Sequence, residues 1–155
     1  MPLMNKGGKF IFGESRIWPD GCVQFPPQAV SEYEIASEGK VYLFTGSKRT
    51  GGFCVTRRGL LLPSKLGHIL TENPALLQFT APPGRFLPYR GRAYCWAAIS
   101  EAGTLRLTKE MLTVLQLEPG MRLLAIRSSD IAFTMGAKGP LLERAAQFQG
   151  EIPLF

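Results

Sequence analysis

Short segments of this chain alternate hydrophobic with polar positions, and glycine or proline residues separate the segments. Alternation with a period of two is typical of strands that bury one face, while glycine and proline mark the turns between them. The pattern predicts eight strands, at residues 10–18, 22–25, 41–45, 53–56, 93–99, 104–107, 121–126 and 131–135. Because the connections are short, we expect successive strands to pair as hairpins, with residues 100–103 as the clearest tight turn. The chain is therefore expected to be mainly β with short helices.

Two short helices are predicted, each between the second and third strand of a group of four. In the later helix Thr108 is a suitable N-cap, and in the earlier one prolines at the start sacrifice no hydrogen bond. Each helix has an apolar face, formed by Met111, Leu112 and Leu115 in the later helix and by Ala29, Val30 and Tyr33 in the earlier one. Residues 63–70 and 142–148 are also amphipathic, so we expect each group to end in a trailing helix.

The same order of elements occurs twice along the chain. Gly21 aligns with Gly103, and the offset between matched positions slides only from 82 to 80 residues over the repeat. A repeated order of turns and apolar phases indicates two copies of one supersecondary unit. We expect two halves, residues 1–70 and 93–155, joined by a connector at 71–92 whose many prolines and glycines make regular structure unlikely over much of its length.

The composition is that of a globular protein, with 45% hydrophobic and 19% charged residues among 155. Such a chain can form one compact domain, or two half-domains that share a core. Cys22, Cys54 and Cys95 lie far apart and form no CxxC pair, so we expect reduced, buried thiols in a cytoplasmic protein. No segment approaches the ~20 apolar residues of a membrane span, and no membrane partner is expected.

Residues 103–135, GTLRLTKEMLTVLQLEPGMRLLAIRSSDIAFTM, resemble the AbrB/MazE/SpoVT swapped-hairpin domain in their glycine turn, short strand, short helix, Pro-Gly turn and final hairpin. Residues 21–44, GCVQFPPQAVSEYEIASEGKVYLF, resemble a fainter second copy. In that family two β-β-α-β-β units, usually from two chains, interleave their hairpins into one closed barrel. The resemblance implies that this chain forms an intramolecular, pseudo-dimeric barrel, which would close the strand edges that a lone unit exposes.

The resemblance also implies that the partner is double-stranded DNA and that the role is transcription regulation. A net charge of +6 and a pI near 9.5 agree with a polyanionic partner. Among the positions that carry the family's DNA contacts, Arg16 is a matching cation, whereas Ala97 and Ala98 stand at the corresponding places in the second copy. Other cations near predicted turns and helix starts could contact phosphates, namely Lys48, Arg49, Arg57, Arg58, Arg106 and Lys109.

Because the two copies differ, we expect an asymmetric surface on which one half makes most of the contacts. Lys48 and Arg49 could equally be solvated charges that protect an exposed strand edge. A homodimer of pseudo-dimers would double the contact surface. The alternative to DNA binding is a swapped-hairpin module that binds a protein partner or a small ligand through the connector and the carboxy-terminal helix.

Near the connector, arginines interleave with aromatic residues, namely Arg85, Phe86, Tyr89, Arg90, Arg92, Tyr94 and Trp96. Such a mixture can grip single-stranded nucleic acid, or the rings can anchor the connector onto the barrel; Trp96 is expected in the core. His68 is the only histidine, and no nucleophile, metal-ligand or dinucleotide motif accompanies it. We therefore expect no catalytic residue, no metal and no cofactor, and a protein that is not an enzyme.

Overall fold

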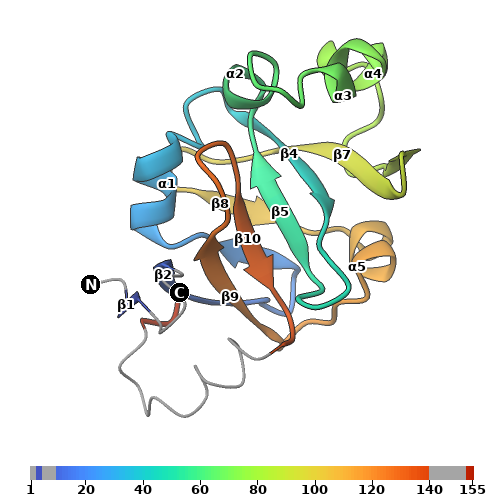
Figure 1. The fold of residues 1–155 in the computed structure, drawn as a ribbon. Helices are drawn as coiled ribbons and strands as arrows, with labels where there is room; N and C mark the ends of the chain where they lie inside the picture. The colour runs from blue at the N-terminus through green and yellow to red at the C-terminus, as the bar shows by residue number, and fades with distance from the viewer. Residues whose placement is uncertain (1–2, 5–9, 140–152) are drawn as a thin grey trace.

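The computed structural model describes residues 3–4, 10–139 and 153–155 (Figure 1). Its strands are β1 (Leu3–Met4), β2 (Phe10–Arg16), β3 (Cys22–Gln24), β4 (Lys40–Thr45), β5 (Phe53–Thr56), β6 (Leu87–Tyr89), β7 (Arg92–Ala98), β8 (Thr104–Arg106), β9 (Arg122–Arg127) and β10 (Phe133–Gly136). Its helices are α1 (Pro27–Tyr33), α2 (Arg58–Leu61), α3 (His68–Thr71), α4 (Pro74–Leu77) and α5 (Lys109–Leu115). Among these described helices, none has the length and apolar character needed to cross a membrane.

All eight predicted strands are present, with ends that differ from the predicted ends by at most two residues. The predicted helices α1 and α5 are also present, and the Met111 N–H donates to Thr108 Oγ1 at 3.3 Å to cap α5. Both helices end at a residue in the left-handed conformation, Glu34 with φ 47° and Gln116 with φ 58°. The protein is mainly β, with few and short helices, as the sequence predicted.

The sheet combines strands from both halves of the chain. Eight strands lie in the order β1-β2-β9-β10-β5-β4-β7-β6, and every neighbouring pair is antiparallel. A separate two-stranded sheet pairs β3 with β8. The halves therefore meet at β2–β9, β10–β5, β4–β7 and β3–β8. Strands β1 and β6 stand at opposite ends of the order, so the expected closed barrel is not found among the described residues.

The first two strands of each half do not pair with each other as the predicted hairpin. Instead β8 pairs with β3, while β7 pairs with β4 and β6. Gly21 and Gly103 open these two strands with φ values of 89° and 85°. The Gly21 carbonyl accepts the Leu107 N–H at 2.8 Å, and the Gly103 carbonyl accepts the Phe25 N–H at 3.0 Å. Left-handed glycines thus direct each short strand away from its neighbour in sequence and towards the other half.

A single main core joins the halves, with the buried Phe133 ring among three aromatic rings of the first half. Its centroid lies 5.3 Å from that of Phe25, 5.3 Å from that of Tyr33 and 6.4 Å from that of Phe12. Tilted and edge-on aromatic pairs contribute about 0.5–1.5 kcal/mol each beyond the area that they bury. Neither half could bury these rings without the other.

A second, smaller core covers the other face of β4 and β7. Along β4, Leu43 faces the main core, whereas Tyr42 packs against the segment that contains α2, α3 and α4. Figure 1 shows these three helices together at one end of the sheet. Tyr42 Oη donates to the Leu76 carbonyl at 2.8 Å, and Trp96 Nε1 donates to the Ala81 carbonyl at 2.7 Å. Aromatic side chains therefore anchor the connector, and Trp96 packs in this second core and not in the main one.

The connector is more regular than expected, because residues 71–92 contain helix α4 and strand β6. Pro74 lies in the first turn of α4, and Pro88 lies in a strand at the end of the sheet order; both places tolerate a missing N–H. The predicted helix at 63–70 has the wrong bounds, since α2 ends before it and α3 begins near its end. The predicted helix at 142–148 lies outside the described residues.

Alanine at Gly21 is expected to lower the free energy of unfolding by about 2–4 kcal/mol. A Cβ there would lie 2.2 Å from the Leu107 carbonyl oxygen, at a φ of 89°. Gly39→Ala is the matched control, because Gly39 has φ 71° but no described atom within 4 Å of an added Cβ. It should lose only the backbone strain, about 1 kcal/mol. Urea unfolding followed by tryptophan fluorescence measures both losses, and equal losses would contradict the close approach.

Thiol reactivity should distinguish the three free cysteines. Cys54 and Cys95 are buried, and burial raises the pKa of the Cys95 thiol to about 12, so little reactive thiolate exists at pH 8. We expect at most the half-buried Cys22 to react with a disulfide reagent within minutes, and all three after unfolding in urea. The Cys22→Ser variant should remove the fast phase. Rapid labelling of Cys95, mapped by mass spectrometry, would show that the core is wrongly assigned.

Candidate nucleic-acid interface

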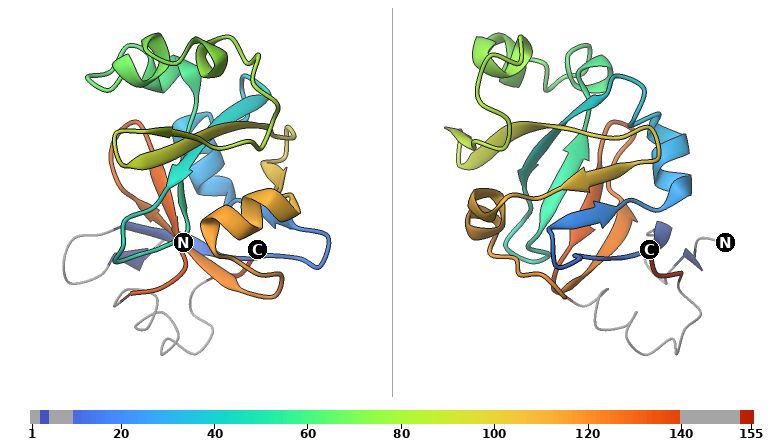
Figure 2. Two further views of the ribbon diagram at one scale, coloured as in Figure 1. Left: turned by 90° about the vertical axis from the view of Figure 1, so that its right-hand side faces the viewer. Right: turned by 180° about the vertical axis from the view of Figure 1, so that it is seen from behind.

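The seven cations predicted as DNA contacts lie in three separate places. Arg16, Arg106 and Lys109 adjoin the turn at residues 18–21, Lys48 and Arg49 lie in the β4–β5 connection, and Arg57 and Arg58 lie at the start of α2. In the left view of Figure 2, the β4–β5 connection (turquoise) and the turn at 18–21 (blue) lie on opposite sides of the molecule. The predicted residues therefore do not form one continuous surface.

The turn at 18–21 gathers cations from both halves. Arg16 ends β2, and its Cζ lies 5.4 Å from the centroid of the Trp18 ring, which is 46% exposed. Arg106, in β8, donates from Nε to the Asp20 carbonyl at 3.1 Å. Lys109 follows two residues after Leu107, whose N–H is bound to the same turn.

Arg122 belongs to the same group, although the sequence reasoning missed it. It is the Cα partner of Arg16 across β2 and β9, and its side chain is 56% exposed. Its Nη1 lies 3.9 Å from Glu14 Oε2, at the outer limit of an ion pair. We call this group the turn cluster, which consists of Arg16, Trp18, Arg106, Lys109 and Arg122. A cation at a strand start carries no signal of its own, and only the pairing of β9 with β2 brings Arg122 to this place.

One carboxylate lies within the turn cluster. The Cys22 N–H donates to Asp20 Oδ1 at 3.0 Å, and this bond lowers the pKa of Asp20, helped by the nearby Arg106. Asp20 is therefore ionised at neutral pH. Four cationic side chains nevertheless surround it, so the turn cluster keeps a positive charge.

The corresponding turn of the second half has the same backbone but different side chains. The Trp18 N–H donates to the Cys22 carbonyl at 3.0 Å, and the Ser100 N–H donates to the Thr104 carbonyl at 3.0 Å. At an offset of 82 residues, Arg16 corresponds to Ala98, Trp18 to Ser100, Arg106 to Gln24 and Lys109 to Pro27. Only Arg122 has a cationic counterpart, Lys40, which is the Cα partner of Ala98. Two equivalent turns thus differ strongly in charge.

Lys48 and Arg49 are exposed in the connection between β4 and β5. The backbone of this connection is fixed at Thr50, whose carbonyl accepts the N–H groups of Ala137 and Lys138 at 2.8 and 2.9 Å. The two cations therefore project from an ordered backbone and form a second basic site, apart from the turn cluster.

Arg57 is engaged inside the protein. Its Nη1 lies 2.8 Å from Glu38 Oε2, its Nη2 lies 3.8 Å from Glu34 Oε2, and its Nε donates to the Tyr33 carbonyl at 3.0 Å. The side chain is only 15% exposed. Arg58 donates from Nη1 to the Leu77 carbonyl at 3.0 Å. These two arginines join the start of α2 to its surroundings and lie apart from the turn cluster.

No group of three His, Cys, Asp or Glu side chains could hold a metal ion within the part of the chain that the structure describes. The single histidine, His68, shares a hydrogen bond of 2.9 Å between its Nδ1 and Tyr89 Oη. This contact joins α3 to β6 and gives the histidine a structural partner.

Replacing Arg57 should cost stability, because the Glu38 carboxylate would lose its cation. We expect Arg57→Gln to lower the free energy of unfolding by about 1–3 kcal/mol. Arg49→Gln, the exposed control, should change it by less than about 0.5 kcal/mol. Chemical denaturation of both variants measures the difference, and an unchanged stability of Arg57→Gln would contradict the structural role of Arg57.

No protein-family model, curated protein or solved structure matches this chain. The contacts within the chain itself therefore carry its functional assignment. Of these, the turn cluster is the place where exposed cations from both halves converge on one rigid turn.

Proposed function

We propose that this protein binds duplex DNA as a transcription regulator of the AbrB-like type, with the turn cluster as its main contact surface. One observation carries the proposal: four cations and a half-exposed indole gather at one turn, whereas the equivalent turn of the other half keeps a single cation, Lys40. A polyanionic duplex is the partner that such a local excess of positive charge favours.

The strands hold the arginines in a geometry suited to phosphates. Cross-strand neighbours lie about 5 Å apart at their Cα atoms, so Arg16 and Arg122 can bind one phosphate from two sides or two adjacent phosphates. Guanidinium groups donate two parallel hydrogen bonds to a phosphate. Packing against Trp18 already restricts Arg16, which reduces the entropy that it loses on binding. Lys48 and Arg49 supply a second contact elsewhere on the duplex.

The strand pairing is compatible with a swapped-hairpin arrangement within one chain. In this arrangement two β-β-α-β-β units exchange their first strands, so that β2 lies on β9 and β7 lies on β4. The chain then supplies both members of a pseudo-dimer. A homodimer of such chains would carry two turn clusters and could contact two sites along a duplex.

Binding to mixed-sequence duplexes should weaken steeply between about 50 and 200 mM salt. In the Arg16→Gln/Arg122→Gln variant, the slope of log affinity against log salt should fall by about 1.8, because two phosphate contacts are lost. Trp18→Ala should weaken binding with little change in slope. Fluorescence anisotropy with a labelled duplex measures both quantities.

The charge-matched control is Lys65→Gln/Arg85→Gln, which removes two exposed cations outside the turn cluster. Its slope should remain that of the wild type. An equal loss of slope in the control would show that net charge, and not the turn cluster, determines binding. No binding to any duplex at low salt, or tighter binding to single strands, would overturn the proposal.

A further inference from the structure

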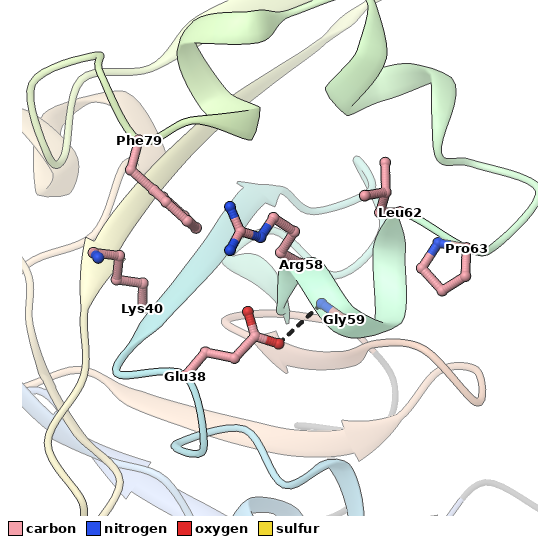
Figure 3. Close-up of a pocket in the computed structure, with 7 residues that line it drawn as sticks. All are labelled: Glu38, Lys40, Arg58, Gly59, Leu62, Pro63 and Phe79. Atoms are coloured by element: carbon pink, nitrogen blue, oxygen red, sulfur yellow. Dashed lines mark hydrogen bonds between the residues drawn. The ribbon is translucent and has the colours of Figure 1, made fainter.

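A pocket of about 350 Å³ lies between β4, α2 and the end of α4, apart from the turn cluster (Figure 3). Its walls include two cations, Lys40 and Arg58, and three apolar side chains, Leu62, Pro63 and Phe79. Pockets that hold small ligands usually measure about 300–1,000 Å³ and combine apolar walls with a few polar groups. This pocket meets both criteria.

The two cations keep their charge available to a ligand. Lys40 Nζ and Arg58 Cζ each lie 5.0 Å from the centroid of the Phe79 ring. Within the described part of the chain, no carboxylate forms an ion pair with either of them. The carboxylate that lines the pocket, Glu38, is already bound by Arg57 at 2.8 Å and by the Gly59 N–H at 2.9 Å. The pocket therefore has an excess of positive charge.

Phe79 forms a fixed aromatic wall. Its ring stacks on Tyr42 with centroids 5.5 Å apart and an interplanar angle of 12°, and Trp96 meets it edge-on at 5.4 Å. Its φ is 55°, a left-handed conformation that costs a residue with a side chain about 1–2 kcal/mol. Backbone strain of this kind concentrates at binding sites. Leu62, an apolar residue that is 39% exposed, lies on another wall of the same pocket.

We propose that this pocket binds a small organic anion that has a flat apolar body and one carboxylate or phosphate group. The anionic group binds Lys40 and Arg58, and the apolar body lies among Phe79, Leu62 and Pro63. An inorganic anion lacks the body, and a neutral aromatic molecule lacks the charge, so both should bind much more weakly. The site is separate from the turn cluster, and its occupation does not depend on DNA binding.

Benzoate and phenyl phosphate are suitable probes, since they share the ring and differ in the anionic group. Titration of the full chain without DNA, followed by isothermal calorimetry and by NMR shifts of Gly59 and Phe79, should detect binding of at least one probe. Benzamide and inorganic phosphate should bind at least about tenfold more weakly, as expected when a charged hydrogen bond is lost. The stronger probe identifies which anionic group the site prefers.

Lys40→Gln should weaken binding of the preferred probe about tenfold or more. Lys48→Gln is the matched control, because Lys48 follows the other end of the same strand, and it should bind like the wild type. Arg58→Gln should also weaken binding, with thermal unfolding as a check on the contact to Leu77. The proposal is overturned if neither probe binds at millimolar concentration, if benzamide binds as tightly as benzoate, or if Lys48→Gln weakens binding as much as Lys40→Gln.

Discussion

Backbone hydrogen bonds between the two halves are the constraint on which the rest of this structure depends. Strands β2 and β9, β5 and β10, β4 and β7, and β3 and β8 each pair across the halves. Buried peptide groups without partners are costly, so each half completes the strand edges of the other. The side-chain core follows the same division, because Phe133 of the second half fills a space among aromatic rings of the first.

The pairing also creates the turn cluster. Arg16 and Arg122 are far apart in sequence and become neighbours only because β2 lies on β9. Arg106 reaches the same turn because β8 lies on β3. The pocket has a different origin, since β4, α2 and the segment after α4 all belong to the first half and the connector. A shared frame thus carries one basic surface formed by both halves, and one pocket at the end where the connector packs.

The positions of the strands could be read from the sequence, because alternation and glycine turns are local signals. The partners could not, since β8 has the same apolar alternation whether it pairs with β7 or with β3. Burial on both faces also hid the second core: Tyr42 in β4 seemed a residue on the outer face until the connector was placed against it. Arg16 was found through the resemblance to a family, whereas Arg122 and Phe79 become significant only through contacts distant in sequence.

The pairing of the halves has a consequence for synthesis of the chain on the ribosome. While the first half emerges, the strands that will pair with β2, β3 and β4 have not yet been translated. At about 5–20 residues per second, several seconds pass before they exist. During that time the first half exposes open strand edges and apolar rings, which are the surfaces that trigger factor-like chaperones cover. The same surfaces could pair with those of a neighbouring nascent chain, so translation speed and chaperone supply determine whether the halves meet within one molecule or between two.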